Sequence, residues 1–320
     1  MIRVGYGERV NTFFQSNPRL CSRIAHHLEF ADYACNETTV ARRTHDHRSR
    51  RLACESHIHL SLKALILDVD GTLADTEEAH RRAFNEAFRS HGLDWNWSKP
   101  QYAELLLTTG GKERIAAFAK TLFLPAADRA AVIEKIPALH KAKTANYTRI
   151  INSGEVPLRD GVERLLDEAR AAGIRLGIAT TTTFENIQAL LHTTLGPAAL
   201  DRFEVIGAGD QVAHKKPAPD IYLHVLEKMG LPAEACVAIE DSVNGLGAAK
   251  AAGLFTIVTP SYWTQGEDFS EADLMLPSLG SAARPLTHRA AMLVGNGVLG
   301  IKEIEERLMV ARKARLASGG

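Results

Sequence analysis

Short apolar runs alternate with amphipathic segments along the chain from Lys63 onward. The apolar runs have the length of buried strands and cover residues 64–67, 176–179, 203–206, 236–239 and 254–258. Between them apolar residues recur at helical spacing, over residues 162–172, 187–191, 220–229 and 244–252. Alternation of strands and helices predicts an α/β fold with a doubly wound, Rossmann-like core, in which helices cover both faces of a parallel sheet.

One long segment interrupts this alternation directly after the first predicted strand. Residues 76–155 carry helical patterns at 76–91, 112–122 and 128–151, and contain no convincing strand. We therefore predict an all-helical cap domain at 76–155, inserted into an α/β core formed by residues 61–75 and 156–280.

Both ends of the chain extend beyond this predicted core. Residues 281–320 end in an amphipathic pattern that predicts a helix packed on the core or on a partner, with apolar positions Ile301, Ile304, Leu308 and Ala311. Residues 1–60 show no sustained period and include a basic tract, so we expect a disordered extension or an over-extended start. The alternatives are a metal- or nucleic-acid-binding arm using His57 and His59, or a transit peptide, which the acidic residues of this stretch disfavour.

Composition narrows the classes of function. The chain is 45% hydrophobic and 24% charged, which is ordinary for a globular protein. Lys+Arg and Asp+Glu number 38 each, and this balance argues against a nucleic-acid or anionic-membrane binder. We expect a small-molecule partner, no nucleic acid, no membrane and a monomeric state.

The sequence also carries expectations about the compartment. It has no apolar run close to the roughly 18 residues of a membrane span and no apolar core of a secretory signal, so we expect a cytoplasmic location. The cysteines are widely spaced, and we interpret Cys21, Cys35, Cys54 and Cys236 as free thiols of a reducing compartment.

Four polar clusters each lie at the end of a predicted parallel strand. They are residues 68–73, 180–182, 215–220 and 240–242. Because the carboxyl ends of parallel strands meet at one crevice, we expect these clusters to form one site. The first and last clusters bring together the carboxylates of Asp68, Asp70, Glu240 and Asp241, which would repel one another without a cation. Hard oxygen ligands predict Mg²⁺ as the cofactor.

The other two clusters complement a negatively charged ligand. A hydroxyl from residues 180–182 and an ammonium from residues 215–216 suit the oxygens of a phosphoryl group. Strand alternation points Asp68 and Asp70 to the same side, and Gly71 allows the chain to turn sharply away from them.

These residues resemble the haloacid dehalogenase-like hydrolase superfamily. Its D-x-D-G-T motif is matched by residues 68–72, its strand-end threonine by Thr180, its lysine before P-x-P by Lys216, and its acidic pair by Glu240-Asp241. The resemblance covers residues 63–277 and implies that Asp68 attacks phosphorus to form an aspartyl-phosphate, while Asp70 acts as general acid and base. It also implies that Thr180 and Lys216 hold the phosphoryl oxygens. Mg²⁺ would then be bound by Asp68, the Asp70 backbone carbonyl and Asp241, with Glu240 ligating directly or through water.

Within the superfamily, segments of the predicted cap resemble the CbbY type of sugar-bisphosphate phosphatase. These segments are residues 75–80, 95–97, 108–114 and 140–143, together with the threonine run 180–183. The resemblance implies a small sugar phosphate as substrate, namely xylulose 1,5-bisphosphate, and an enzyme that is a phosphoric monoester hydrolase. The related β-phosphoglucomutases share the four motifs, so a phosphosugar mutase is the alternative, and a catalytically idle binding protein is a second one.

A bisphosphate needs a second anion site, and the predicted cap offers candidates for it. Gly110 and Gly111 allow the backbone to approach a ligand, and Lys112, Arg114 and Lys143 are positioned to clamp a distal phosphate, unless they are ordinary solvated helix charges. Glu77 would bind sugar hydroxyls, or alternatively favour the first turn of a helix. Thr181 completes the substrate-binding residues, while Trp95 and Trp97 are more typical of a cap core than of a substrate platform.

Overall fold

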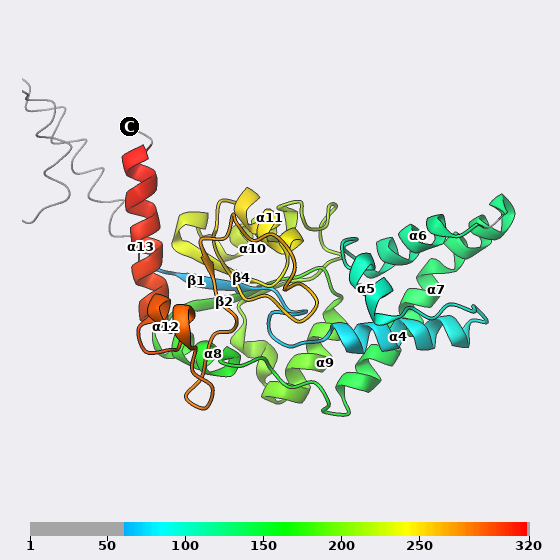
Figure 1. Ribbon diagram of the computed structural model, residues 1–320, viewed down its shortest axis with the longest axis horizontal. Coiled ribbons are helices and arrows are strands. Elements are labelled where there is room, and N and C mark those ends of the chain that lie inside the picture. Colours follow the sequence, from blue (N-terminus) through cyan, green and yellow to red (C-terminus); the bar gives the residue numbers. More distant parts are fainter. Residues whose placement is uncertain (1–60, 124, 319–320) are drawn as a thin grey trace, which may run out of the picture. The chain divides into compact units, whose positions relative to one another are not determined.

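A six-stranded parallel sheet forms the centre of the computed structural model, which describes residues 61–123 and 125–318 (Figure 1). Its strands lie in the order β3-β2-β1-β4-β5-β6. Their bounds are β1 Ala64–Leu67, β2 Arg175–Ala179, β3 Val205–Gly207, β4 Cys236–Glu240, β5 Phe255–Val258 and β6 Leu274–Met275. Leu67 pairs with both Ile178 and Ile239, so the three central strands end at one level.

Helices cover both faces of the sheet, as the doubly wound fold prediction requires. Figure 1 shows α10 (Asp220–Met229) and α11 (Val243–Ala251) on one side of the strands and α8 (Val162–Ala171) and α9 (Phe184–Leu195) on the other. Alternation along β1 explains the two layers: Leu65 and Leu67 belong to one buried cluster, and Ala64 and Ile66 to the other. The predicted fold class is confirmed.

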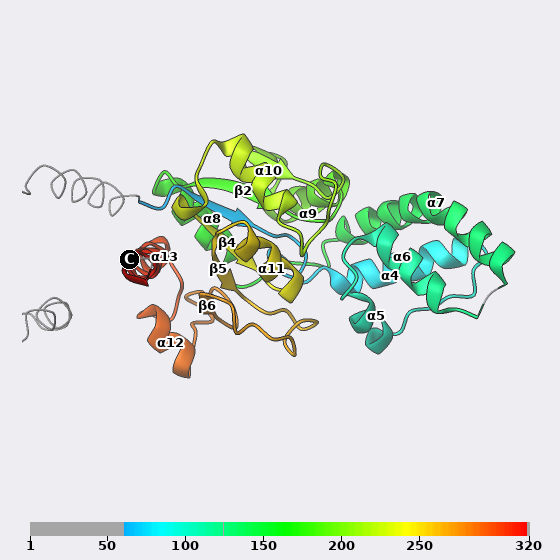
Figure 2. The same cartoon turned by 90° about the horizontal axis from the view of Figure 1, so that it is seen from above.

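The insertion after β1 is helical. It comprises α4 (Glu77–Ser90), α5 (Lys99–Leu105), α6 (Gly111–Thr121) and α7 (Ala126–Ile151), which lie together beside the sheet in Figure 2. These helices share an apolar cluster of their own, which includes Phe84, Phe88, Trp97, Tyr102 and Phe118. Trp97 is fully buried there and Trp95 is partly buried against it, as expected of a cap core.

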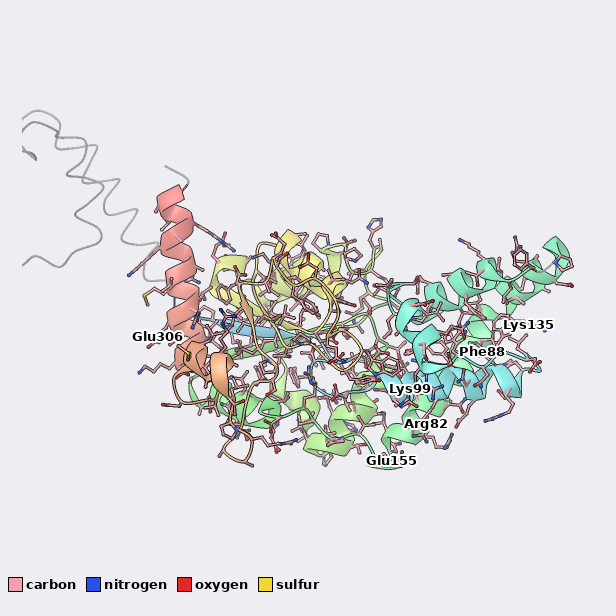
Figure 3. The ribbon with its side chains drawn as sticks, viewed as in Figure 1. Arg82, Phe88, Lys99, Lys135, Glu155 and Glu306 are labelled. Carbon is pink, nitrogen blue, oxygen red and sulfur yellow. The ribbon has the colours of Figure 1, made fainter. Side chains whose placement is uncertain are left out.

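Side chains of the insertion also contact the chain segment that returns to the core. Figure 3 labels Arg82 on α4 and Glu155 in the linker after α7, whose side chains form an ion pair 3.0 Å apart. An isolated bridge between Ala74 and Leu158 joins the outgoing and returning segments. We propose residues 76–155 as the boundaries of the cap.

The structure differs from the sequence-based expectations mainly where elements are short. The helices α5 and α12 (His288–Val294) and the two-residue strand β6 were not predicted, because each is too short to show a period. The strand predicted at 203–206 begins at Val205 instead, because residues 199–202 form a 3₁₀ turn and Phe203 enters the core from the following loop. The helix predicted at 187–191 extends over all of α9.

The C-terminal segment packs on the core. Helix α13 (Ile301–Ser318) buries Ile301, Ile304 and Leu308 in the same apolar cluster as α8, so the predicted apolar face is real. Among residues 61–123 and 125–318, no helix combines the length and apolar character needed to cross a membrane. Cys236 is a buried free thiol, and burial raises its pKa to about 12. The predictions for residues 1–60, including Cys21, Cys35 and Cys54, lie outside the described residues.

Candidate active site

A buried lysine connects the polar residues at the ends of the central strands. Lys216 Nζ donates hydrogen bonds to Asp68 Oδ1 at 2.6 Å, to Glu240 Oε1 at 2.6 Å and to the Ala179 carbonyl at 2.8 Å. The three contacts come from β1, β4 and β2, which end side by side. The parallel sheet therefore gathers these residues as the sequence predicted.

Asp241 completes an acidic cluster beside Asp68. Carboxylate oxygens of Asp68, Glu240 and Asp241 all lie within 4.8 Å of one another, and all three residues are buried. Gly71 makes this approach possible: its φ is +83°, and a Cβ there would lie 2.1 Å from Asp241 Oδ2. The turn after β1 thus requires glycine for two separate reasons.

Burial and repulsion disfavour ionisation of Asp68 and Asp241. Burial raises the pKa of Asp68 to about 7, the charge of Glu240 adds to the rise, and Lys216 opposes it. Burial likewise raises the pKa of Asp241 well above its usual range, with the charges of Asp68 and Glu240 adding to the effect. Burial opposes the charge of Lys216, but the adjacent carboxylates of Asp68 and Glu240 outweigh it and raise the lysine pKa. If all four groups are charged, the cluster carries an excess of negative charge.

The donor set fits a divalent cation. Three carboxylates meet around one point, and their excess negative charge is what a hard dication neutralises. Glu240 is the innermost member: its Oε1 is occupied by Lys216 and by the Tyr222 hydroxyl. Its buried Oε2 accepts no hydrogen bond from any residue that the structure describes, and it faces Gly245, where a Cβ would approach to 1.8 Å. Oε2 is therefore the oxygen of Glu240 that remains available to a water or a metal.

The second aspartate of the first motif belongs to a different network. Asp70 Oδ1 accepts a hydrogen bond from Thr76 Oγ1 at 2.6 Å and lies 2.9 Å from His80 Nε2. Burial favours the neutral acid, but His80 and Thr76 outweigh it and lower the pKa of Asp70. The His80 ring stacks on Tyr147 of α7, with centroids 4.1 Å apart, which fixes its orientation. Asp70 is thus held by two residues at the start of the helical insertion.

The threonine run after β2 forms a polar wall of the same cavity. Thr180 is 1% exposed, and its backbone N–H donates to the Gly207 carbonyl at 3.0 Å, which fixes the end of β2 against β3. Thr181, Thr182 and Asn186 line the cavity next to it. Asn186 Nδ2 donates to Thr182 Oγ1 at 2.9 Å, while its buried Oδ1 has no partner among the described residues.

The insertion contributes a second set of charges. The Tyr102 hydroxyl donates to Glu77 Oε2 at 2.7 Å and accepts from Arg114 Nη1 at 2.9 Å. The Arg114 guanidinium also lies over the Tyr102 ring, 5.2 Å from its centroid. Lys143 is 4% exposed, and burial lowers its pKa to about 8, with the nearby Arg114 adding to the decrease and Asp70 opposing it. Arg114 and Lys143 are therefore buried charges rather than solvated helix charges.

Gly110 and Gly111, at the start of α6, bring the backbone close to one side chain of the core and one of the insertion. A Cβ at Gly110 would lie 2.7 Å from Lys215 Cδ of the core, and one at Gly111 would lie 2.8 Å from His140 of α7. Lys112 differs from the other cations, because it is partly exposed and its Nζ lies 3.4 Å from Asp210 of the core. Lys112 therefore forms an ion pair across the cavity mouth in this conformation.

Nearly all residues predicted for the site line one cavity between the strand ends and the insertion. The lining includes Asp68, Asp70, Glu77, Gly110, Gly111, Lys112, Arg114, Lys143, Thr180, Thr181, Lys216 and Asp241. Glu240 does not line it and lies beneath Lys216. Thr182, from the expected cluster 180–182, also lines it, and the sequence-based prediction missed other lining residues, among them His80, Asn186, Asp210 and Thr264. Of these, only His80 had a recognisable signal, since it lies one helical turn after Thr76.

Comparison with known proteins identifies the family. Residues 62–253 match the model of the haloacid dehalogenase-like hydrolases. The chain belongs to this family. It is therefore a hydrolase. Some of its relatives are named phosphatases. Protein CbbY of Rhodobacter capsulatus is 56% identical over 224 residues, which cover 70% of this chain and 96% of the relative. Protein CbbY of Cereibacter sphaeroides is 49% identical over 222 residues, covering 68% of this chain and 92% of the relative.

Solved structures agree with these sequence relatives. CbbY from Rhodobacter sphaeroides in complex with phosphate superposes with a TM-score of 0.63 at 48% identity, over 69% of this hydrolase and 98% of that chain. A mutant of the same protein was solved in complex with xylulose-1,5-bisphosphate, with the same TM-score of 0.63. A β-phosphoglucomutase from Clostridium difficile, at 21% identity over 77% of this chain and 97% of that one, superposes with a TM-score of 0.57 and shares the fold.

Proposed function

We propose that this hydrolase is a magnesium-dependent phosphatase that removes one phosphoryl group from a sugar bisphosphate, specifically xylulose 1,5-bisphosphate. The observation that carries the proposal is the pairing of two charge centres in one cavity. Asp68 lies at the strand ends with Lys216, and the buried cations Arg114 and Lys143 lie on the insertion. The solved complex of a related CbbY with that bisphosphate supports the choice of substrate.

The acidic cluster suits Mg²⁺ as the cofactor. Asp68 and Asp241 would hold the ion with the backbone carbonyl of Asp70, and Glu240 would contribute through water. Bound there, Mg²⁺ supplies charge neutralisation for the transferring phosphoryl oxygens. Lys216 remains hydrogen-bonded to Asp68 Oδ1 and keeps that oxygen in place, while the other carboxylate oxygen is free to react.

The proposed reaction has two steps, each centred on Asp68. In the first, a carboxylate oxygen of Asp68 bonds to phosphorus, the bond from phosphorus to the sugar oxygen breaks, and Asp70 gives that oxygen a proton. In the second, water attacks phosphorus, Asp70 takes a proton from the water, and the aspartyl-phosphate bond breaks to release phosphate. Thr180 and Lys216 hold the phosphoryl oxygens in both steps.

Asp70 must hold a proton before it can act as the acid. In the structure its contacts with His80 and Thr76 favour the ionised form. A phosphoryl group bound beside it adds negative charge and raises its pKa toward protonation. The proton that Asp70 takes from water in the second step restores the acid for the next turnover.

The distal phosphate would bind to the insertion. Arg114 and Lys143 are buried cations, and a phosphate dianion offsets the cost of burying both. Gly110 and Gly111 present backbone at the start of α6, and Lys112 is positioned to exchange Asp210 for the phosphate. Glu77 and Thr181 are left to bind the sugar hydroxyls.

A panel of phosphorylated sugars with purified protein and Mg²⁺ tests this proposal. Steady release of inorganic phosphate from xylulose 1,5-bisphosphate, with kcat/KM at least about tenfold above that for sugar monophosphates, is expected. Isomerisation without phosphate release would instead indicate a mutase, and equal rates on mono- and bisphosphates would refute the second anion site. Arg114→Met should raise KM for the bisphosphate, whereas Arg89→Met, a matched change at an arginine in the last turn of α4 that does not line the cavity, should not.

A further inference from the structure

The loop after β5 carries a tryptophan that packs into the insertion. Trp263 belongs to the core by sequence, yet it packs against the apolar cluster of α4–α7. Its ring centroid lies 5.5 Å from that of Tyr102 on α5, at an interplanar angle of 86°. This edge-to-face geometry is favourable for aromatic pairs. The cluster of the insertion is thus completed by a side chain from outside it.

The partner of Trp263 organises the proposed substrate contacts. Tyr102 is fully buried, and its hydroxyl joins Glu77 to Arg114 through hydrogen bonds of 2.7 and 2.9 Å. Arg114 packs over the same ring that meets Trp263. A displaced Tyr102 ring would therefore change the positions of both Glu77 and Arg114.

The loop itself is fixed to the core at several points. Thr264 Oγ1 donates to Asp241 Oδ2 at 3.3 Å, and the Ser261 backbone N–H donates to Thr264 Oγ1 at 2.9 Å. Arg159 donates to the carbonyls of Thr259 at 2.7 Å and Pro260 at 2.8 Å. The position of the indole is therefore set by the same core segment that touches the acidic cluster.

We infer that Trp263 is a positioning residue for substrate selection, which acts through Tyr102 to hold Glu77 and Arg114 in place for the distal part of a sugar bisphosphate. The inference rests on the proposed function, because it assigns Arg114 to the distal phosphate. Trp263 does not line the cavity and makes no contact with substrate in this scheme. Its effect is confined to ligands that reach Arg114.

Kinetics of Trp263→Ala test the inference on two substrates. We expect KM for the sugar bisphosphate to rise about 3- to 10-fold, the range expected for loss of one aromatic pair, with kcat little changed. Hydrolysis of p-nitrophenyl phosphate, which is too short to reach Arg114, should change by less than about twofold. Trp263→Phe keeps a ring at the contact and should restore most of the affinity. Phe123→Ala removes an exposed ring of the insertion that does not contact Trp263, so as a control it should leave both KM values near those of the wild type.

A double-mutant cycle distinguishes action through Tyr102 from general damage. Tyr102→Phe keeps the ring and removes the hydroxyl, so it should raise KM for the bisphosphate by itself. Adding Trp263→Ala to Tyr102→Phe should then raise KM by less than it does in the wild type. Additive effects, or equal losses on both substrates, would overturn the inference. A wild-type enzyme without preference for bisphosphates would overturn the proposed function, whereas a preference that Trp263→Ala leaves undiminished overturns only the role of Trp263.

Discussion

Replacing Lys216 with methionine should lower the free energy of unfolding, because it removes the positive charge next to the acidic cluster. Methionine keeps a similar length and removes the ammonium, which leaves Asp68 and Glu240 without the donor that lies 2.6 Å from each. Removing one partner of a buried ion pair costs about 3–5 kcal/mol. A domain of ordinary stability has about 5–15 kcal/mol in total, so the loss should be large and easy to measure.

Urea unfolding followed by circular dichroism, in EDTA at pH 7.5, measures this loss. The burial of Asp68 already raises its pKa to about 7 with the lysine present, and removing the lysine raises it further. The carboxylates of the variant then take up protons as the pH falls, so the difference from the wild type should shrink toward pH 4. Phosphatase activity should fall by about 10² or more, because a phosphoryl ligand is lost as well.

Lys215→Met is the matched control. Lys215 Nζ donates to the Gly209 carbonyl at 2.8 Å and lies 3.5 Å from the exposed carboxylate of Asp210. Such a contact is worth at most about 1 kcal/mol, so the control should unfold close to the wild type. If the two variants were equally stable in EDTA, the cluster would not depend on Lys216 and the electrostatic argument would be wrong.

Three further outcomes are expected. Asp68→Asn should abolish phosphate release, and measurable turnover would contradict the assignment of the nucleophile. Above pH 7 in EDTA, this variant should nevertheless unfold at a urea concentration no lower than the wild type does. The substitution removes a carboxylate whose raised pKa shows that its ionised form is disfavoured in the folded protein. Gly71→Ala should weaken Mg²⁺ binding in titration calorimetry, because its Cβ would overlap Asp241. Gly173→Ala, with a φ of +70° and nothing within 4 Å, should show only the backbone cost of about 1–2 kcal/mol and unaltered Mg²⁺ binding. In EDTA, the wild type should lose stability relative to Asp68→Asn as the pH rises from about 4 to about 7, because the folded pKa of Asp68 lies above its unfolded value of 3.8. Taking this variant as the reference cancels the opposite contribution of His140, whose pKa burial lowers to about 4. Mg²⁺ should abolish the difference, and parallel profiles in EDTA would contradict the raised pKa of Asp68.

The strand-end residues were predictable because one rule relates their positions in the sequence to their positions in the fold. Asp68, Thr180 and Asp241 each follow a buried apolar run, and parallel strands bring such positions to one edge. The cluster that contains Lys216 was expected at a strand end as well, but it lies in the loop between β3 and α10, and the resemblance to a known family selected Lys216 within it. The roles proposed for these residues remain predictions.

Other features left no pattern in the sequence. Tyr102 lies on α5, which is only seven residues long, and Trp263 lies in a loop, so neither belongs to a periodic segment. Their contact depends on how the insertion packs against the core, and no local rule specifies that. The burial of Arg114 and Lys143 was equally invisible, because charged helix residues are exposed in most proteins.

The helical insertion has a consequence for engineering. It is one uninterrupted stretch of chain that leaves and re-enters the core beside the Ala74–Leu158 bridge. Two crossovers in the gene would therefore exchange the entire insertion for that of a relative and keep the strand-end residues Asp68, Lys216 and Asp241. The graft would need its own equivalents of Thr76 and His80, because these two residues of the insertion hold Asp70. Trp263 would remain in the recipient, so a grafted segment would need an aromatic surface that accepts its indole.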